Sequence, residues 1–258
     1  MLDTTITELA LRHEASRDFV KAILTGNNLL EIAERSIGAD DFCARAGDSW
    51  KYASYAFGTN QRAENSLQKM LALALPDQFG VALDVGCGYG GFLRAFGRKG
   101  FKAHGIEINS NLVGLAKLNL QDVAFEHEIF EGDVFADGPI LGKYDLITVN
   151  DVIEHLNDPI FAFNRMATML NPGGVLAIYA PNGQSIFNVI ADPHNRVCGS
   201  ASMPGPLART YVQATLNSSG YSLGEYFSLE IFEDLAKRND LEFKYKPHDG
   251  GERPEKAK

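Results

Sequence analysis

The sequence predicts an α/β protein built on a doubly wound, mostly parallel sheet that follows an N-terminal helical cap. Two observations carry this prediction. Short apolar runs alternate with helical segments over residues 79–182, and the first run ends in a glycine-rich turn. Strands and helices that alternate at this spacing form parallel sheets with right-handed crossovers. The 258 residues, 45% of them hydrophobic, suffice for one such domain with additions.

Residues 1–77 are expected to form the helical cap or lid. Apolar residues recur at helical spacing through most of this stretch. The last of its helices must end before Pro76, because proline disfavours helical geometry in the residue that precedes it. Trp50, Tyr52 and Tyr55 come before that helix, and such an aromatic group either packs the cap or closes over a ligand.

Residues 78–182 form the predicted core. The fourth apolar run is almost free of polar residues, as a strand buried on both faces should be. Asp158 and Pro159 suit the N-cap and first turn of a helix, and residues 171–174 turn the chain into the last strand. The expected strands are residues 81–85, 101–108, 124–130, 144–149 and 175–180. This order of elements is Rossmann-like.

The remainder of the chain is less regular. Residues 183–227 are expected to form an insertion on the substrate side of the core. Residues 228–247 should supply the last helix and strand of the core, with the strand at residues 241–245. Residues 221–227 are an alternative source of a last strand. The polar residues 248–258 are expected to form a disordered tail.

Charge and cysteine content narrow the class of protein. A net charge of −9 disfavours nucleic acid as a partner, because nucleic-acid binders usually carry a basic surface. Cys43, Cys87 and Cys198 are far apart and lack the spacing of a disulfide scaffold or a zinc site. The sequence shows no signal peptide and no apolar run long enough for a membrane span. We therefore expect a cytoplasmic protein without a membrane span.

The glycine-rich turn is the first candidate for a binding site. The first strand ends at Asp84, and Gly86, Gly88 and Gly90 follow it. Glycine adopts backbone angles that other residues avoid, and its missing side chain lets a ligand lie against the main chain. Dinucleotide-binding folds use such turns, although a tight turn without a ligand has the same appearance. Cys87 is expected to be a small space-filling residue in this turn.

Glu107 supports a nucleotide-containing cofactor. It ends the second strand, 23 residues after Asp84 and close to the spacing of about 20 residues that dinucleotide-binding sites show. A carboxylate at this place can accept hydrogen bonds from both ribose hydroxyls. A nicotinamide dinucleotide stays possible at this point, because Gly91 supplies the third glycine of its motif.

Residues 79–182 resemble the class I S-adenosylmethionine-dependent methyltransferases. Residues 131–135 are similar to the segment whose acid binds the adenine amino group, and this places Asp133 there. Residues 144–150 are similar to the strand under the methionine part, and residues 170–176 to the turn into strand five. The segments at Asp133 and at the last turn have no counterpart in dinucleotide-binding proteins. The resemblance implies S-adenosylmethionine as cofactor, bound by Asp84, Gly86, Cys87, Gly88, Glu107, Ile108, Asp133, Val134 and Asn150.

Residues 150–159 resemble a subgroup that includes the ubiquinone-pathway O-methyltransferases and the small-RNA 2′-O-methyltransferases. Some members bind a divalent cation through an acid-x-x-Glu-His cluster, which Asp151, Glu154 and His155 match in spacing. Aspartate stands here where those members carry glutamate, and metal-free relatives keep the same Glu-His pair, so a metal is not favoured. We expect these three residues to be catalytic. An imidazole with a pKa of about 6.5 can take a proton from an acceptor or orient it.

The resemblance implies O-methylation of a small-molecule or glycan hydroxyl. Two alternatives stay open, namely N- or C-methylation of a small metabolite and a non-catalytic cofactor-binding partner protein. A nucleic-acid acceptor is disfavoured by the charge. His194 and Arg196 follow the fifth strand, and they either face the substrate or lie in a solvated loop.

Overall fold

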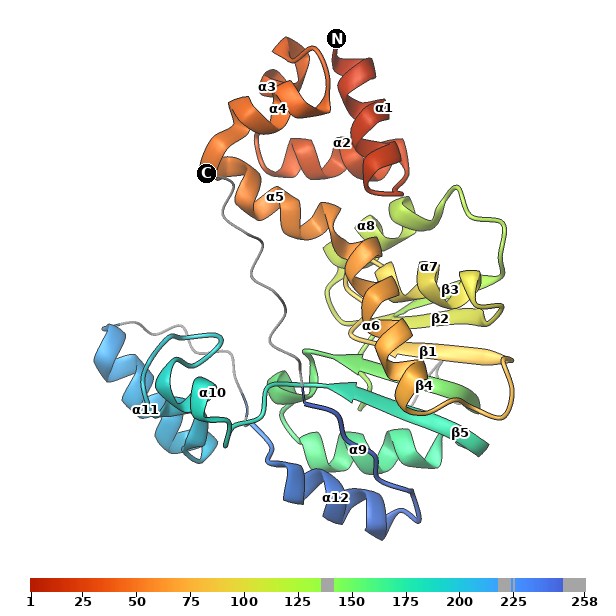
Figure 1. Ribbon diagram of the computed structural model, residues 1–258, viewed down its shortest axis with the longest axis vertical. Coiled ribbons are helices and arrows are strands. Elements are labelled where there is room, and N and C mark those ends of the chain that lie inside the picture. Colours follow the sequence, from red (N-terminus) through yellow and green to blue (C-terminus); the bar gives the residue numbers. More distant parts are fainter. Residues whose placement is uncertain (136–141, 218–223, 225, 248–258) are drawn as a thin grey trace.

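The computed structural model describes residues 1–135, 142–217, 224 and 226–247. A cap of helices lies at the top of Figure 1, a parallel sheet with flanking helices forms the centre, and a small helical lobe lies at the left. No helix within the described ranges is long and apolar enough to cross a membrane.

Within the described residues the sheet has five strands in the order β3-β2-β1-β4-β5, and all neighbours are parallel. The prediction of a doubly wound parallel sheet is confirmed. Since β1 lies between β2 and β4, the chain reverses its direction of winding beside β1. Ligands of open α/β sheets bind outside the carboxyl ends of the strands at such a point. The strands are β1 (Val81–Val85), β2 (Lys102–Glu107), β3 (His127–Glu131), β4 (Tyr144–Asn150) and β5 (Leu170–Tyr179).

Helices cover both faces of the sheet. On one face, Phe96 of α7 and Leu67 of α6 share a buried cluster with Ala82 of β1. On the other, Met166 of α9 shares a second cluster with Leu83 of β1. Ala82 and Leu83 thus face opposite sides, as neighbouring residues of a strand do. The flanking helices are α6 (Thr59–Leu73), α7 (Gly91–Arg98), α8 (Ser110–Leu120), α9 (Pro159–Thr168) and, outside α9, α12 (Leu229–Arg238).

The N-terminal helices form a layer of their own with an aromatic core. Trp50 packs against Phe42 and Phe57, with ring centroids 5.5 and 5.3 Å apart. Tyr55 is 62% exposed, and the Arg62 guanidinium lies over its ring. Trp50 therefore packs the cap. The side chain of Tyr52 lies outside the described part. The helices are α1 (Leu2–Arg12), α2 (Arg17–Gly26), α3 (Leu30–Arg35), α4 (Ala39–Ala46) and α5 (Trp50–Phe57).

A buried pair of asparagines joins the cap to the core. The Asn119 amide donates to Asn60 Oδ1 at 2.9 Å and to the Tyr89 carbonyl of the glycine-rich turn at 2.8 Å. The Asn60 amide donates to the carbonyl of Glu14, between α1 and α2, at 2.9 Å. Asn119 is fully buried, so each of these polar groups depends on its partner. The pair therefore links the cap, α6, α8 and the glycine-rich turn.

Replacing Asn119 by alanine should destabilise the fold by about 2–4 kcal/mol, because a buried polar group that loses its partner costs roughly 1–3 kcal/mol. Chemical denaturation of the purified chain measures this change. Asn111→Ala is the matched control on the exposed side of the same helix α8, and we expect it to stay within about 0.5 kcal/mol of the parent. Equal stability of the two variants would contradict the assigned role of the asparagine pair.

Three strands begin at residues that differ from the prediction, and β2 does so by a single residue, at Lys102. β3 starts at His127, since Phe125 turns inward against α7 and its ring occupies the space where a Cβ on Gly97 would lie. β5 already starts at Leu170, which pairs with Tyr144. Residues 171–174 then form an irregularity within the strand before Val175 pairs with Leu146. The predicted turn is thus a bulge inside β5.

The prediction of a last strand at residues 241–245 is wrong. These residues are described, and they form no strand after α12. Apolar and polar residues alternate here as in a strand, but Phe243 and Tyr245 are 37% and 49% exposed. Pairing would therefore gain little apolar burial. Residues 221–227 lie largely outside the described part, and residues 248–258 lie entirely outside it.

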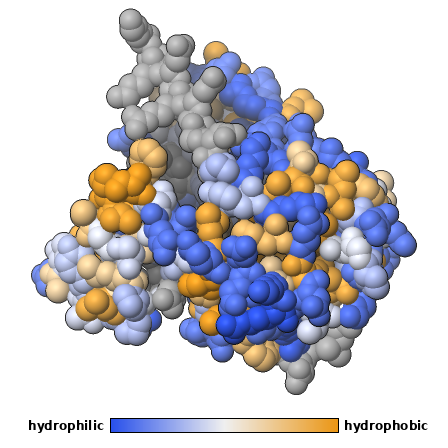
Figure 2. Space-filling view, turned by 60° about the horizontal axis from the view of Figure 1, so that its bottom comes forward, coloured by the Kyte–Doolittle hydropathy of each residue, from blue (hydrophilic) through white to orange (hydrophobic). Residues whose placement is uncertain are grey.

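The lobe between β5 and α12 carries α10 (Ile186–Ile190) and α11 (Gly205–Leu216). Figure 2 shows hydrophobic residues on the surface of this lobe, at the left. Phe187 of α10 is 79% exposed, and its neighbours Ile186 and Ile190 are more than half exposed. The lobe thus presents an apolar surface next to the core.

Candidate functional site

The glycine-rich turn is fixed to the end of β2. Gly86, Gly88 and Gly90 have φ angles of 71°, 51° and 78°, in the left-handed region that glycine adopts readily. The amides of Gly86 and Cys87 both donate to the carbonyl of Ile106, at 2.9 and 3.0 Å. A Cβ on Gly86 would lie 2.5 Å from a methyl group of Val152. Position 86 therefore requires glycine, because its backbone is left-handed and a Cβ there would clash with Val152.

Glu107 lies beside this turn with a nearly buried carboxylate. Its Oε2 accepts a hydrogen bond from the Gly88 amide at 3.0 Å, and its Oε1 accepts one from the Asn109 amide at 2.9 Å. Each carboxylate oxygen can accept more than one hydrogen bond. The two amides thus orient the carboxylate and leave acceptor capacity for a ligand's hydroxyl groups.

Asp84 precedes the glycine-rich turn and Cys87 lies within it, and both side chains are buried. The Thr148 hydroxyl donates to Asp84 Oδ1 at 2.6 Å, and burial raises the pKa of Asp84 to about 7. Burial also raises the pKa of the Cys87 thiol, whose sulfur fills the space beside Gly105. The thiol is therefore protonated at neutral pH and unsuited to act as a nucleophile. This matches the space-filling role expected for Cys87.

A cavity of about 270 Å³ opens at the carboxyl ends of the strands. Among the predicted cofactor residues, Gly86, Glu107, Ile108, Asp133 and Val134 line it. These come from the ends of three neighbouring strands, so the parallel sheet brings together residues far apart in the sequence. The other predicted cofactor residues do not line the cavity, but they are close in sequence to residues that do. They are Asp84, Cys87, Gly88 and Asn150.

The segment after β4 carries the predicted catalytic residues. Asp151 and His155 line the same cavity. Asp151 has a φ of 52°, and its amide donates to the Tyr179 carbonyl of β5 at 2.8 Å. The turn at Asp151 leads into a short 3₁₀ helix, Ile153–His155, on which Glu154 and His155 are neighbours.

Glu154 differs from the other two because it is only 1% exposed. Neither of its carboxylate oxygens has a hydrogen-bond partner among the described residues. Burial raises the pKa of Glu154 to about 7, and the charge of Asp151 contributes to the increase. The amide of Gly224 donates to the main-chain carbonyl of Glu154 at 2.7 Å, which fixes the backbone here.

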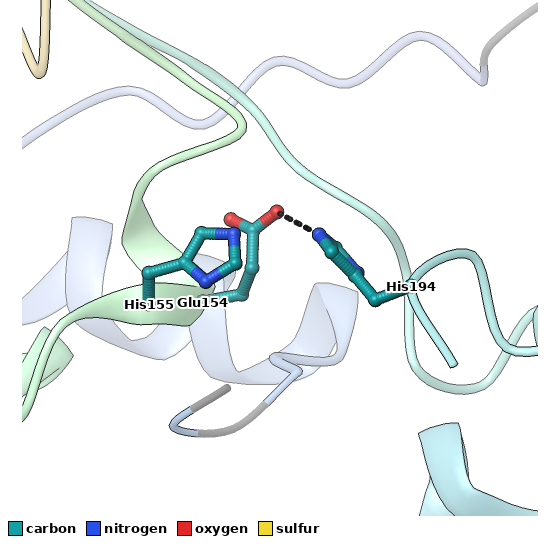
Figure 3. Close-up of side chains that lie close together, drawn as sticks. All are labelled: Glu154, His155 and His194. Carbon is teal, nitrogen blue, oxygen red and sulfur yellow. Dashed lines mark ion pairs between the residues drawn. The ribbon is translucent and has the colours of Figure 1, made fainter. Parts of the chain in front are cut away.

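His194 comes from the loop after α10 and lies beside this pair (Figure 3). Its ring centroid is 4.9 Å from that of His155, with the two rings nearly perpendicular. His194 Nε2 lies 4.0 Å from Glu154 Oε1. Burial lowers the pKa of His194, and the nearby His155 lowers it further. His194 is exposed and is not among the residues that line the cavity, so a contact with the substrate stays a prediction.

Two further residues hold His194, and sequence reasoning gave no role to either. His194 Nδ1 lies 2.6 Å from the Tyr226 hydroxyl, which donates to Asp192 Oδ1 at 3.2 Å. Asp192 is fully buried and also accepts hydrogen bonds from the His194 amide and the Ser200 hydroxyl. Aspartate often binds the amide two residues onward, so Asp192 was detectable as the start of a turn. No sequence signal points to Tyr226. Arg196 is exposed and does not line the cavity.

Comparison with known proteins identifies the protein family that this chain matches. A family model described as a methyltransferase domain matches residues 52–243. The ubiquinone biosynthesis O-methyltransferase of Aeromonas salmonicida is 29% identical over 102 residues, which cover 39% of this chain and 42% of that protein. The enzyme of the same name from Xanthomonas campestris is 33% identical over 104 residues, with the same two shares. The match spans about two fifths of the length of these relatives.

Solved structures support the fold. The YcgJ protein from Bacillus subtilis has a TM-score of 0.50 at 16% identity, and the match covers 69% of this chain and 68% of that one. A putative methyltransferase in complex with the Trm112 activator of Haloferax volcanii has a TM-score of 0.52, also at 16% identity, over 74% of both chains. At this identity the likeness concerns the fold alone.

Proposed function

This chain belongs to the class I S-adenosylmethionine-dependent methyltransferase family, and we propose that it moves a methyl group onto a hydroxyl of a small molecule or a glycan. S-adenosylmethionine is the methyl donor of the family. The observation that carries the proposal is the cavity at the carboxyl ends of β1, β2, β3 and β4, which Glu107 and His155 both line.

Glu107 is assigned to the ribose of the cofactor. Its carboxylate is already oriented by the Gly88 and Asn109 amides, so ribose binding requires no rearrangement of the side chain. Asp133, at the end of β3, is assigned to the adenine amino group. Its Oδ1 accepts from the Phe135 amide at 3.0 Å, which fixes the carboxylate at the cavity wall. Ile108 and Val134 supply apolar contacts on either side.

Methyl transfer places modest chemical demands on the protein. The sulfonium of the cofactor is a strong electrophile, and the main task of the site is to align acceptor oxygen, methyl carbon and sulfur. As the O–CH₃ bond forms, the S–CH₃ bond breaks and the hydroxyl loses its proton. We assign His155, with Glu154 and Asp151 next to it, to the acceptor hydroxyl and its proton. A hydroxyl suits this polar cluster, because an alcohol must be deprotonated before or during attack.

The lobe beside the site favours an acceptor with an apolar portion. Phe187, Ile186 and Ile190 are exposed on α10, and the chain reaches His194 four residues after that helix ends. An acceptor that reaches from the His155–His194 pair toward α10 would cover these side chains and gain from their burial. This observation favours a small molecule over a glycan.

His155→Ala should lower kcat for methyl transfer by about 100-fold or more, because loss of a positioned proton acceptor typically costs a factor of 10²–10⁴. Transfer of a radiolabelled methyl group from the cofactor to a panel of phenols, alcohols, amines and sugars measures this effect and identifies the acceptor. His127→Ala is the matched control, since His127 lies at the opposite, amino end of β3. It should retain activity within about twofold.

The same assay decides between the alternatives. Labelled product from amines or carbon acids alone would contradict O-methylation and favour an N- or C-methyltransferase. Tight binding of cofactor without product from any acceptor would contradict catalysis and favour a non-catalytic binding partner. The net charge of −9 disfavours nucleic acid as the acceptor.

A further inference from the structure

Phe135 lies in the cavity wall close to the residue that is assigned to adenine. It lines the cavity together with Asp133 and Val134, in the turn that follows β3. Asp133 Oδ1 accepts a hydrogen bond from the Phe135 amide, so the carboxylate and the aromatic ring belong to one short turn. Aromatic side chains often stack on nucleic-acid bases, because every base has a π-face. The Phe135 ring is therefore placed to contact the adenine whose amino group Asp133 is assigned to bind.

The ring of Phe135 is supported by Phe161, which comes from the first turn of α9. The two ring centroids lie 5.8 Å apart, and the ring planes are inclined by 25°, which is a stacked arrangement. Phe161 is not among the residues that line the cavity, so a ligand in the cavity would meet Phe135 first. The contact joins the turn after β3 to the helix that follows β4.

Packing of the core does not account for Phe161. The buried face of α9 consists of Ala162, Phe163 and Met166, of which none is more than 4% exposed. Phe161 is 48% exposed and belongs to none of the buried clusters of the described residues. A half-exposed ring contributes less to folding than a core ring does, because less of its apolar surface leaves water. The stacking on Phe135 therefore concerns the cavity more than the core.

The N-cap of α9 fixes the backbone of Phe161. Asp158 is the N-cap, and its Oδ1 accepts a hydrogen bond from the Phe161 amide at 2.9 Å. Pro159 follows in the first turn, where its restricted φ suits a helix. Leu156 and Asn157, directly before the cap, line the same cavity as Phe135. The start of α9 thus lies against the cavity with its main chain held in place, and its aromatic ring can serve as a rigid support.

We propose that Phe161 is a positioning residue for the cofactor and acts by holding the Phe135 ring against the adenine. The inference deepens the proposed function and rests on the placement of the adenine beside Asp133. A ring that is already stacked loses less freedom when a ligand binds, so this support raises the affinity through preorganisation. The adenine is remote from the methyl group that is transferred. Phe161 therefore contributes to cofactor binding and leaves the chemical step unchanged.

Calorimetry with S-adenosylhomocysteine and with 5′-methylthioadenosine tests this role without requiring turnover. Both compounds carry the adenine, and only the first carries the amino-acid part. Phe161→Ala should weaken the binding of both by the same factor of about three to ten, as expected for the loss of one aromatic pair. Phe161→Tyr keeps the stacked ring and should bind both compounds within about twofold of the parent.

Ile160→Ala is the matched control for Phe161→Ala. Ile160 is also 48% exposed and lies in the same helical turn, but it lines a separate groove together with residues of α12. We expect this variant to bind both compounds within about twofold of the parent, as is usual for a surface substitution away from a site. Melting curves establish that each variant is folded.

A double-mutant cycle tests whether Phe161 acts through Phe135. In a chain that already carries Phe135→Ala, the further substitution Phe161→Ala should weaken binding by less than about twofold, because the two rings share one contact. An equal loss in the presence and in the absence of the Phe135 ring would overturn the inference.

Two other results would also overturn it. One is a folded Phe161→Ala chain that binds both compounds as tightly as the parent. The other is a loss confined to S-adenosylhomocysteine, since such a loss would concern the amino-acid part of the cofactor. In each of these cases the parent still binds the cofactor, and the proposed function stands. A parent chain that binds neither compound would overturn the proposed function together with this inference.

Discussion

Replacing Glu107 by alanine is expected to reduce the affinity for S-adenosylhomocysteine by at least about 100-fold. The carboxylate is assigned to both ribose hydroxyls, and a hydrogen bond to a charged group contributes about 1.5–3 kcal/mol. Two such bonds account for a factor of 100 or more. The side chain also accepts hydrogen bonds from the Gly88 and Asn109 amides, so its removal loosens the turn that carries the cofactor. Isothermal titration calorimetry measures the change.

Glu131→Ala is the matched control for this experiment. Glu131 ends the neighbouring strand β3 and is the registered partner of Glu107, but its side chain is exposed and lies outside the cavity lining. We expect it to bind the cofactor within about twofold of the parent. Thermal melts of both variants establish that they are folded. A folded Glu107→Ala chain with unchanged affinity would contradict the placement of the ribose.

Gly86→Ala is expected to destabilise the chain by about 2–5 kcal/mol. The left-handed backbone at this position costs a residue with a Cβ roughly 1–2 kcal/mol, and overpacking adds about 1–3 kcal/mol. The new Cβ would lie 2.5 Å from Cγ2 and 3.0 Å from Cγ1 of Val152. Urea denaturation measures the loss. Because the turn and Val152 both line the cavity, cofactor affinity should decrease as well.

Two further variants separate the contributions of strain and contact. Gly88→Ala has a similar left-handed angle, but its Cβ would meet only the Gly86 carbonyl, at 4.0 Å. Its cost should therefore stay at about 1–2 kcal/mol. The double variant Gly86→Ala with Val152→Ala should recover the part of the loss that arises from the clash. If the second substitution restores nothing, the contact with Val152 is not the cause.

The core was predictable because its signals are local. The two central strands, β1 and β4, are short and mostly apolar runs, and burial on both faces of a parallel sheet produces such runs directly. Asp158 was identifiable as an N-cap, and it accepts a hydrogen bond from the Phe161 amide as expected. Residues 241–245 show the limit of such signals. Their alternation is typical of a strand, but the gain from pairing depends on a neighbour that sequence does not reveal.

The candidate site likewise contains residues that the sequence predicted and residues that it did not. Glu107 and Asp133 follow strands whose order is set by the fold, so their convergence on one cavity follows from the topology. His194 and Tyr226 depend on the path of the loops between β5 and α12, which have no repeating pattern. The neighbourhood of His194 and Glu154 is a tertiary contact across 40 residues of sequence. Spacing within the Asp151–His155 segment therefore gave no indication that His194 lies beside Glu154 and His155.

A crystal structure of the chain with S-adenosylhomocysteine tests the central claim most directly. We predict one cofactor molecule in the cavity at the carboxyl ends of β1, β2, β3 and β4. Its ribose hydroxyls should lie within hydrogen-bond distance of the Glu107 carboxylate, its adenine beside Asp133, and its sulfur toward His155. A cofactor bound elsewhere, or bound in this cavity with its ribose away from Glu107, would contradict the account.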